Sequence, residues 1–360
     1  MRGWIASRHT RQIAPDPHHP RKNSMPTKIA INGLGRIGRN QLRLLMTRRS
    51  DLELVALNDP RGARGIADLL ESDRGSGRPT AATRHDDKHL FLNGHAIRVY
   101  AEHDRRSLPW DELGVDIVIE STGQAARADA AREHLAAGAE KVIMTSPAAG
   151  DDGTFVLGVN DGSYDPDRHH VISSGSCTTL CLAPVLQVFD DAFGIDAALM
   201  TTVHSGSVDD CVQDIPHADL LPAGTRDARI TASSLGAAEA VTRVLPHLDG
   251  RLEGTALRAP TLRGSITHLT VTATRTVTAD EVRVAFQTAS EGRLKGILRC
   301  ADDEIAVSDS VIDPHSSILD TTLIRATGSQ VKISAWYDDE WGYSHRLAEL
   351  IAHVAEGRTP

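Results

Sequence analysis

Short apolar runs alternate with helical patterns through the first half of the chain. Four such runs, each typical of a strand buried on both faces, occupy residues 28–32, 52–57, 116–120 and 141–144. A helical repeat of apolar residues around Leu42 and Leu45 follows the first run, and an alanine-rich helical stretch at 128–137 lies between the last two. This alternation predicts an α/β fold built on a Rossmann-type, doubly wound parallel sheet.

Longer strands of alternating polarity replace this pattern after Ser173. The clearest is the segment 265–274, where apolar and polar side chains alternate as expected for a sheet with one covered face. The chain ends in a helical segment, 343–356, with a single apolar stripe. We therefore predict a first domain at 26–173, completed by a C-terminal helix within 339–360. The second domain, 174–338, is expected to be of α+β type with a large, mostly antiparallel sheet.

Residues 1–25 differ from the rest of the chain. They contain five Lys/Arg against one acidic residue, three His and three Pro, and no apolar run of signal-peptide length. We interpret them as a disordered N-terminal lead. Met25, just before the first strand, is an alternative start of the chain.

Composition narrows the classes of function. The 360 residues are 40% hydrophobic, enough for two ordinary cores, and the net charge of −9 argues against a general nucleic-acid-binding surface. No run reaches the ~18 consecutive apolar residues of a membrane-spanning helix. Four cysteines without a C-x-x-C pair predict neither a disulfide framework nor a zinc motif. We expect a cytoplasmic protein with reduced thiols and no metal, nucleic-acid or membrane partner.

A glycine-rich turn links the first predicted strand to the first helix. Gly33-Leu-Gly35-Arg-Ile-Gly38 fits the G-x-G-x-x-G pattern, and Asp59 follows Gly38 by 21 residues, close to the spacing of a ribose-binding carboxylate. A glycine turn needed only for packing is the alternative. With Asp59 downstream, dinucleotide binding is favoured, and a carboxylate there favours NAD over NADP. Arg61 and Arg64 act against that preference.

Cys177 and His204 are the candidate catalytic pair. Cys177 stands after a strand at the expected start of a helix, where the helix dipole favours a thiolate. His204 follows the apolar strand 198–203 and opens a polar loop, so it is a candidate base. Without further information, a buried structural cysteine and an incidental loop histidine are the ordinary alternatives.

Six ordered blocks of sequence carry a resemblance to a known family. The chain from about Lys28 to the C-terminal helix resembles the phosphorylating glyceraldehyde-3-phosphate dehydrogenases, with the erythrose-4-phosphate dehydrogenases as close relatives. The blocks are Ile31-Asn-Gly-Leu-Gly-Arg-Ile-Gly-Arg39, Glu120-Ser-Thr-Gly123, Ser176-Cys-Thr-Thr179, Thr201-Thr-Val-His204, Arg258-Ala-Pro-Thr261 and Trp336-Tyr-Asp-Asp-Glu-Trp-Gly-Tyr343.

The resemblance implies roles for individual residues. Cys177 would be the nucleophile and His204 the base, with NAD as cofactor. The implied cofactor-binding residues are Gly33, Gly35, Arg36, Ile37, Gly38, Asp59, Ser146, Asp339 and Tyr343. The implied substrate-binding residues are Ser176, Ser207, Asp209, Gly236 and Arg258, of which Ser207, Asp209 and Arg258 would hold the substrate's own phosphate.

The resemblance also implies a mechanism and an assembly. The thiolate attacks the aldehyde to give a hemithioacetal, His204 takes the hydroxyl proton as hydride leaves for NAD, and phosphate then releases the thioester as an acyl phosphate. The family further implies a homotetramer, in which the loop from Ser205 to about Arg229 lines both the cofactor site and a subunit interface.

Four positions depart from the family pattern. Gly224 stands where the family has the second anion-site arginine, and Leu235 where it has a site threonine. Leu180 and Asp339 replace asparagines, the second of which orients the nicotinamide carboxamide. We therefore expect the site for the attacking phosphate to be weak.

Three functions remain open at this stage. The first is a glyceraldehyde-3-phosphate dehydrogenase, which serves either glycolysis or, as a secondary copy, a specialised pathway. The second is a dehydrogenase of another phosphorylated or phosphonylated aldehyde, such as erythrose 4-phosphate, with water completing the cycle. The third is a non-catalytic NAD-binding paralogue, whose expected mark is loss of the cysteine or histidine, and both residues are present.

Overall fold

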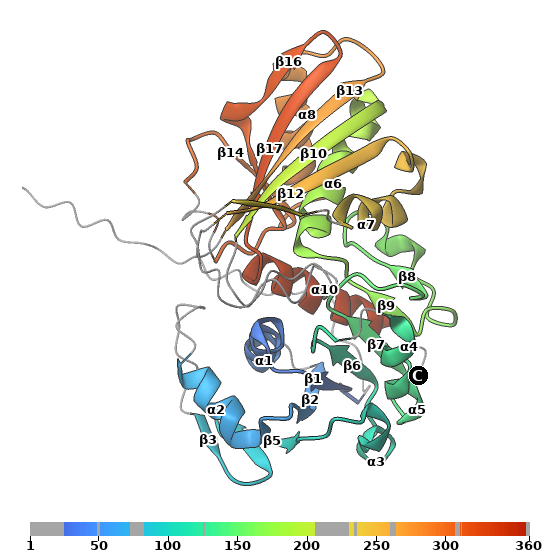
Figure 1. Ribbon diagram of the computed structural model, residues 1–360, viewed down its shortest axis with the longest axis vertical. Helices are drawn as coiled ribbons and strands as arrows, with labels where there is room; N and C mark the ends of the chain where they lie inside the picture. Colours follow the sequence, from blue (N-terminus) through green and yellow to red (C-terminus); the bar gives the residue numbers. More distant parts are fainter. Residues whose placement is uncertain are drawn as a thin grey trace, which may run out of the picture.

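The chain folds around two β-sheets with one long helix between them (Figure 1). The structure is a computed structural model. It describes residues 25–48, 51–72, 83–124, 127–205, 230–233, 236–259, 264–306, 310 and 312–357. The predicted lead at 1–25 lies outside these residues except for Met25.

The first sheet has nine strands in the described part of the chain, in the order β3-β4-β5-β2-β1-β6-β7-β9-β8. The strands from β5 to β8 in this order pair in parallel, whereas β3, β4 and β5 pair antiparallel at one edge. The bounds are β1 Thr27–Asn32, β2 Leu52–Asn58, β3 Thr83–His85, β4 His89–Leu92, β5 His95–Tyr100, β6 Ile117–Glu120, β7 Lys141–Met144, β8 Gly153–Thr154 and β9 Val171–Ser173. All four residues of β6 and of β7 are buried, which explains their unbroken apolar sequences.

The helices of the first half follow the strands as predicted, with one difference. They are α1 Arg36–Arg48, α2 Gly62–Ser72, α3 Trp110–Leu113, α4 Ala128–Ala131 and α5 Glu133–Ala136. The alanine-rich stretch was expected to be one helix, but it is divided into α4 and α5 at Arg132. The backbone tightens there to ψ −18°, and Leu135 N donates to the Arg132 carbonyl three residues back, as in a 3₁₀ turn.

The second sheet is mostly antiparallel, with the order β11-β12-β10-β13-β17-β15-β14 and with β16 beside β17. In this second sheet, only the β10–β12 and β14–β15 pairs among the described strands are parallel. The bounds are β10 Ile195–Ser205, β11 Thr231–Ser233, β12 Leu252–Ala259, β13 Ser265–Ala273, β14 Leu298–Ala301, β15 Ser317–Asp320, β16 Arg325–Thr327 and β17 Gln330–Tyr337. The two sheets confirm the predicted fold class.

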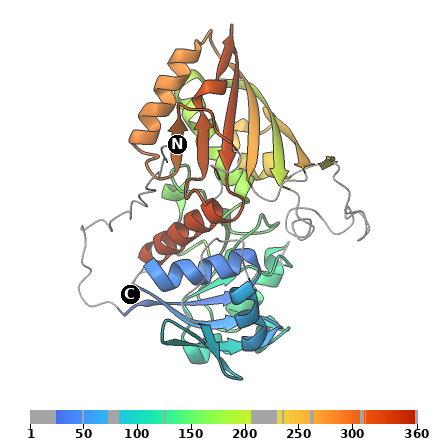
Figure 2. The ribbon, with the colours of Figure 1, turned by 90° about the vertical axis from the view of Figure 1, so that its left-hand side faces the viewer.

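Three helices of the second half accompany this sheet, and a fourth joins the two halves. They are α6 Cys177–Phe193, α7 Ala237–Val244, α8 Ala279–Glu291 and α10 Trp341–Gly357. Figure 2 shows α8 along one face of the sheet, and α10 beside α1 between the two sheets. The Gln41 side chain in α1 donates to the Ser344 carbonyl of α10 at 2.7 Å. Since α10 carries the end of the chain back to α1, residues just before it reach both halves.

Within the described residues, no helix combines the length and apolar character needed to cross a membrane.

Candidate active site

The end of β9 delivers Cys177 to the first position of α6. Gly175 has a φ of +70°, a left-handed conformation that turns the chain between β9 and α6. Ser176 is the N-cap residue, and its hydroxyl accepts a hydrogen bond from Thr179 N at 3.1 Å. Cys177 is half-buried at the positive end of a 17-residue helix that has no acidic residue in its first turn. This position favours a thiolate.

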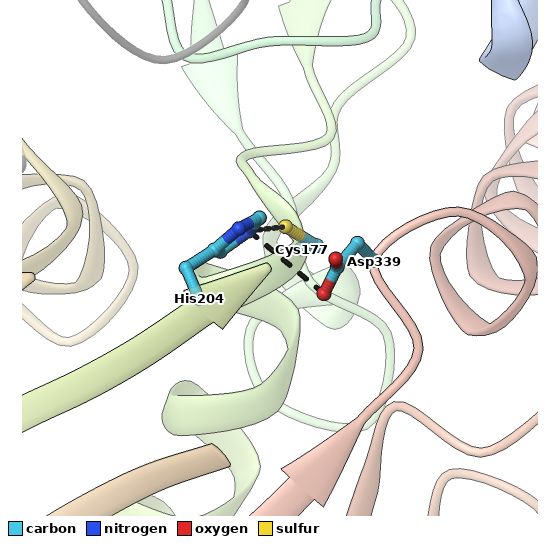
Figure 3. A group of neighbouring side chains, drawn as sticks. All are labelled: Cys177, His204 and Asp339. Carbon is cyan, nitrogen blue, oxygen red and sulfur yellow. Dashed lines mark hydrogen bonds and ion pairs between the residues drawn. The ribbon is translucent and has the colours of Figure 1, made fainter. Parts of the chain in front are cut away.

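His204 comes from the second sheet and meets Cys177 directly. Its Nε2 lies 3.4 Å from Cys177 Sγ, and only 3% of the histidine is exposed. Figure 3 shows the two side chains pointing toward each other. His204 was predicted to open a loop, but β10 continues to Ser205 because it pairs in parallel with β12, which places His204 opposite Arg258. The strand therefore holds the imidazole more firmly than a loop would.

The second ring nitrogen of His204 decides whether the first can act as a base. Nδ1 lies 2.9 Å from the Ser205 carbonyl oxygen and 2.7 Å from Arg258 Nη1. A carbonyl only accepts and a guanidinium only donates, so Nδ1 cannot satisfy both at once. With its proton on Nδ1 and donated to Ser205, the ring presents the Nε2 lone pair to Cys177. Arg258 Nη1 also lies 3.4 Å from the same carbonyl, which gives it an alternative acceptor.

Asp339 is the third polar side chain of this group. It lies between β17 and α10, and its Oδ1 is 3.8 Å from His204 Nε2 (Figure 3). The Ser265 hydroxyl donates to Oδ1 at 2.5 Å, and the Ser205 hydroxyl donates to Oδ2. The two serines thus hold the carboxylate beside the histidine.

Tyr337 packs against His204, and the sequence alone did not identify it as a site residue. Its hydroxyl lies 3.0 Å from Thr178 Oγ1 and 2.8 Å from Thr202 Oγ1, and its ring contacts His204 edge-on at 6.2 Å between centroids. Burial raises the pKa of Tyr337 well above its usual value, and the charges of Cys177 and Asp339 raise it further. The phenol therefore stays protonated and links α6 to β10. Its place in the Trp336–Tyr343 block was the one available signal.

The glycine turn has the geometry that a dinucleotide needs. Gly33 has a φ of +95°, and a Cβ there would lie 2.7 Å from Thr122 N. A Cβ on Gly38 would lie 2.0 Å from the Gly33 carbonyl oxygen, so this glycine allows close packing of α1. A Cβ on Gly35 would meet its nearest atom only at 4.0 Å. The backbone at Gly35 is thus not crowded, which suits the close approach of a pyrophosphate.

Asp59 lies at the end of β2 with both oxygens engaged. Leu34 N donates to Oδ2 at 2.7 Å, and the Arg61 guanidinium donates to both oxygens at 2.7 and 2.9 Å. Burial acts to raise the pKa of the Asp59 carboxyl, but Arg61 and the backbone N–H groups outweigh it, so the pKa is lowered. The carboxylate is therefore charged and partly neutralised by Arg61. These residues fit a ribose-binding role for Asp59.

A buried cluster supports the glycine turn, and the sequence did not reveal it. Glu120 Oε2 accepts from Asn32 Nδ2 at 2.6 Å and from Arg105 Nε at 3.1 Å. It also lies 3.0 Å from Nε2 of His134, whose Nδ1 accepts from the Trp110 indole at 2.9 Å. An indole only donates, so Nδ1 of His134 accepts, and its Nε2 carries a proton toward Glu120.

Arg105 places a positive charge beside Glu120, with its Nε 3.1 Å from Oε2. Burial opposes ionisation, yet the interactions with His134, the charge of Arg105 and the hydrogen bond from Thr122 lower the pKa of Glu120 to about 2. Asn32 also accepts from Asn58 Nδ2 at 2.7 Å. The cluster thereby ties together the ends of β1, β2 and β6, directly behind Gly33.

Two further predicted residues, Ser146 and Tyr343, lie beside the turn between β9 and α6. Ser146 follows β7, and its carbonyl accepts from Ser173 Oγ at 2.9 Å. The Tyr343 hydroxyl donates to the Gly175 carbonyl at 3.3 Å and contacts Ser174. Both residues thus lie at the turn that leads to Cys177.

The other predicted residues lie in or beside the helices α1, α6, α7 and α10, or they lie outside the described residues. Arg36, at the start of α1, forms an ion pair with Glu340 at 3.2 Å, beside Asp339, and Ile37 is buried in the core. Gly236 is the N-cap residue of α7 and is exposed; no hydrogen bond in the described structure joins it to Cys177. Leu180 is a buried core residue of α6. Four predicted positions lie outside the described residues: Ser207, Asp209, Gly224 and Leu235.

Comparison with known proteins agrees with this geometry. The family model for the NAD-binding domain of glyceraldehyde 3-phosphate dehydrogenase matches residues 27–128. The family model for the C-terminal domain of the same enzyme matches residues 176–339. Glyceraldehyde-3-phosphate dehydrogenase 2 of Streptomyces arenae is 48% identical over 330 residues, which cover 92% of this chain and 99% of that protein.

Other relatives are similar over the same extent. The glyceraldehyde-3-phosphate dehydrogenase of Kitasatospora aureofaciens is 46% identical over 91% of this chain and 99% of its own length. That of Mycobacterium bovis is 45% identical over 92% of this chain and 99% of its own length. The cofactor for which the glycine turn is shaped is NAD. The chain belongs to the glyceraldehyde-3-phosphate dehydrogenase family.

Proposed function

We propose that this protein is an NAD-dependent glyceraldehyde-3-phosphate dehydrogenase in which Cys177 and His204 carry the reaction. The relatives named above are glyceraldehyde-3-phosphate dehydrogenases, and they match nearly the whole chain. The observation that carries the assignment of the pair is the 3.4 Å separation of Cys177 Sγ and His204 Nε2 at the N-terminus of α6. Retention of both residues argues against the non-catalytic paralogue.

Each of the two side chains has a distinct task. His204 Nε2 takes the thiol proton as Cys177 Sγ adds to the aldehyde carbon, and it returns this proton to the carbonyl oxygen, which becomes the hydroxyl of the hemithioacetal. His204 Nε2 removes the proton of that hydroxyl, so that the C–O double bond reforms as a hydride departs. NAD, when bound, accepts the hydride. The product on the enzyme is a thioester of Cys177, which retains the oxidation energy that direct hydrolysis would release.

Arg258 is assigned to the phosphate of the substrate. It is 6% exposed and stands opposite His204 on the neighbouring strand. Arg258 contacts His204, and His204 in turn contacts Cys177. A guanidinium can bind two phosphate oxygens at once. Movement of Arg258 from His204 Nδ1 to such an anion would also leave Nδ1 free to donate to Ser205, the arrangement that His204 needs as a base. Ser207 and Asp209 are assigned to the same phosphate on the family resemblance.

Thioester release completes the cycle, and the attacking group is assigned by residue type. Ser176 and Gly236 remain from the family's second anion site, whereas Gly224 and Leu235 supply no charge. We assign inorganic phosphate as a weak acceptor, with water as the competing one. The same proposal includes the NAD-site residues Gly33, Gly35, Arg36, Ile37, Gly38, Asp59, Ser146, Asp339 and Tyr343.

The family resemblance supports the wider setting. We assign a homotetramer in the cytoplasm, with no nucleic-acid or membrane partner. Within each chain, 26–173 with the helix in 339–360 would form the NAD-binding domain, and 174–338 the catalytic domain.

The decisive experiment is a comparison of aldehydes. NADH formation is measured with glyceraldehyde 3-phosphate, erythrose 4-phosphate and unphosphorylated glyceraldehyde, each with and without inorganic phosphate. We expect the highest kcat/KM with glyceraldehyde 3-phosphate and, without phosphate, a burst of about one NADH per site. A higher kcat/KM for erythrose 4-phosphate would make that aldehyde the substrate, and no NADH from any of them would reject the dehydrogenase assignment.

A further inference from the structure

Cys177, His204 and Asp339 form a set of three side chains that suits a metal ion. We propose that Zn²⁺ binds to Cys177 Sγ, His204 Nε2 and Asp339 Oδ1 and thereby blocks the active cysteine reversibly. The site itself stands on the positions of these three side chains. Its effect on turnover rests on the proposed function.

The distances match a tetrahedral ion with small adjustments. Sγ lies 3.4 Å from Nε2, Nε2 lies 3.8 Å from Oδ1, and the three ligand atoms all lie within 4.8 Å of one another. Zinc takes sulfur at about 2.3 Å and nitrogen or oxygen at about 2.0–2.2 Å, so ligand atoms around a tetrahedral ion are about 3.4–3.6 Å apart. Sγ and Nε2 already have nearly this spacing, and a small shift of the Asp339 carboxylate would bring Oδ1 closer to both; Figure 3 shows the three side chains together.

Neighbouring groups hold the three ligand side chains close to the positions that coordination requires. The Ser205 carbonyl, 2.9 Å from His204 Nδ1, favours the tautomer that leaves the Nε2 lone pair available. The hydroxyls of Ser205 and Ser265 hold the two oxygens of Asp339. Arg258 Nη1 contacts the same Nδ1, so metal binding would move this guanidinium toward the Ser205 carbonyl, 3.4 Å away.

The donor set selects the class of ion. One thiolate and one imidazole favour zinc over magnesium and calcium, which prefer oxygen ligands. A thiolate and a carboxylate together balance the two charges of Zn²⁺. Three protein ligands leave the fourth position for water, as in zinc sites that remain open. Cys177 is half-buried rather than enclosed, so the ion has a route of entry.

Asp339 distinguishes this site from a simple cysteine–histidine pair. An asparagine at this position would offer only a neutral carbonyl oxygen, a weaker ligand for Zn²⁺ than a carboxylate. Coordination would also occupy the sulfur that attacks the aldehyde and the nitrogen that takes the proton. Zinc inhibition should therefore compete with the aldehyde.

The binding test uses Co²⁺ as a spectroscopic probe and needs no turnover. The full-length protein, freed of metals and reduced, is titrated with Co²⁺ without NAD. We expect one ion per chain, a sulfur-to-cobalt charge-transfer band and intense visible bands typical of tetrahedral cobalt, all displaced by Zn²⁺. The charge-transfer band should be absent in Cys177→Ser. Its persistence in that variant, or its absence in the wild type, would overturn the site.

Two variants test the role of Asp339. Zinc affinity is measured by competition with a chromophoric chelator, and Asp339→Asn should bind at least about ten-fold more weakly. Glu340→Gln is the matched control, since it removes a negative charge one residue away without removing a ligand; it should retain affinity within about three-fold. Equal affinity for Asp339→Asn and the wild type, or equal losses in both variants, would show that Asp339 is not a ligand.

A chemical readout links binding to the cysteine. Zinc should protect Cys177 from alkylation by iodoacetamide, followed by mass spectrometry, and protection in Asp339→Asn should require at least about ten-fold more zinc. Unprotected alkylation under saturating zinc would reject the site. Should the cobalt and protection results hold while no aldehyde is oxidised, the proposed function fails and the metal site stands.

Discussion

Cys177 Sγ and His204 Nε2 lie 3.4 Å apart although the two residues are 27 positions apart in sequence and belong to different elements. The cysteine begins α6, whereas the histidine is the penultimate residue of β10. The proposed nucleophile at a helix N-terminus thus faces the proposed base, which a strand holds. Each can be altered without removing the element that carries the other.

Replacement of the nucleophile should separate chemistry from cofactor binding. Cys177→Ser should lower kcat by at least about a thousand-fold, because a hydroxyl is a far weaker nucleophile than a thiolate, and should leave NAD affinity nearly unchanged. Cys300→Ser is the matched control, since Cys300 lies in β14, outside the described catalytic group, and it should retain activity. Substantial turnover by Cys177→Ser would contradict a thioester mechanism.

Arg61 should weaken the preference for NAD over NADP. It neutralises part of the Asp59 charge through two hydrogen bonds, so Arg61→Ala should expose the 2′-phosphate of NADP to a less compensated carboxylate. We expect the ratio of kcat/KM for NAD to that for NADP to rise by about three- to ten-fold, the scale of one hydrogen bond. Arg64→Ala is the control, because Arg64 is exposed and, among the described residues, pairs with Asp68 at 4.0 Å rather than with Asp59. A fall in the ratio for Arg61→Ala would show that Arg61 assists NAD.

Asp339 should limit the affinity for NAD at neutral pH. An ionised carboxylate can accept from the NH₂ of the nicotinamide carboxamide but cannot donate to its oxygen, whereas asparagine can do both. Asp339→Asn should therefore bind NAD about three- to ten-fold more tightly in titration calorimetry. The measurement includes a chelator, so that metal at the same site does not contribute. Equal or weaker binding would exclude this role.

Glu120 should make the first sheet sensitive to acid. Its pKa of about 2 lies below the ordinary value of 4.5, so ionisation stabilises the fold at pH values above 4.5. This stabilisation, up to about 3 kcal/mol, is lost progressively as the pH falls from 4.5 toward 2. Glu120→Gln should lower the melting temperature at pH 7, and its difference from the wild type should shrink between pH 5 and pH 3. A difference independent of pH would indicate that packing, rather than charge, is responsible.

Phosphate should bind poorly as the acyl acceptor. Glycine at 224 supplies no charge where an arginine would bind the incoming anion, and a charged hydrogen bond contributes on the order of 1.5–3 kcal/mol. Initial rates against phosphate concentration should give a KM roughly ten- to hundred-fold above that of a relative with arginine there. Gly224→Arg should lower this KM. Saturation of the wild type at ordinary low phosphate would instead assign the role to a nearby cation such as Arg226 or Arg229.

Local features of the sequence were sufficient to predict several elements and the position of Cys177 at the start of a helix. The glycine turn, the strands around it and the start of α6 at Cys177 follow from periodicity, backbone freedom and N-capping, which act over a few neighbouring residues. The family motifs extended this prediction to His204. The break at Arg132 and the continuation of β10 through His204 were missed, because a tightened turn and a strand partner leave no clear mark on local pattern.

Which side chains meet depends on how distant segments pack together. His204 reaches Cys177 because β10 and β12 pair in parallel up to Ser205, and Asp339 joins them because the chain returns after β17 to enter α10. The Glu120 cluster likewise needs the ends of β1, β2 and β6 side by side. These contacts depend on strand order and register between segments far apart in the chain, which hydrophobic periodicity does not encode. The elements and the kinds of side chain they carry can thus be inferred from the sequence, whereas the packing of the two sheets places Asp339 beside the candidate pair Cys177 and His204.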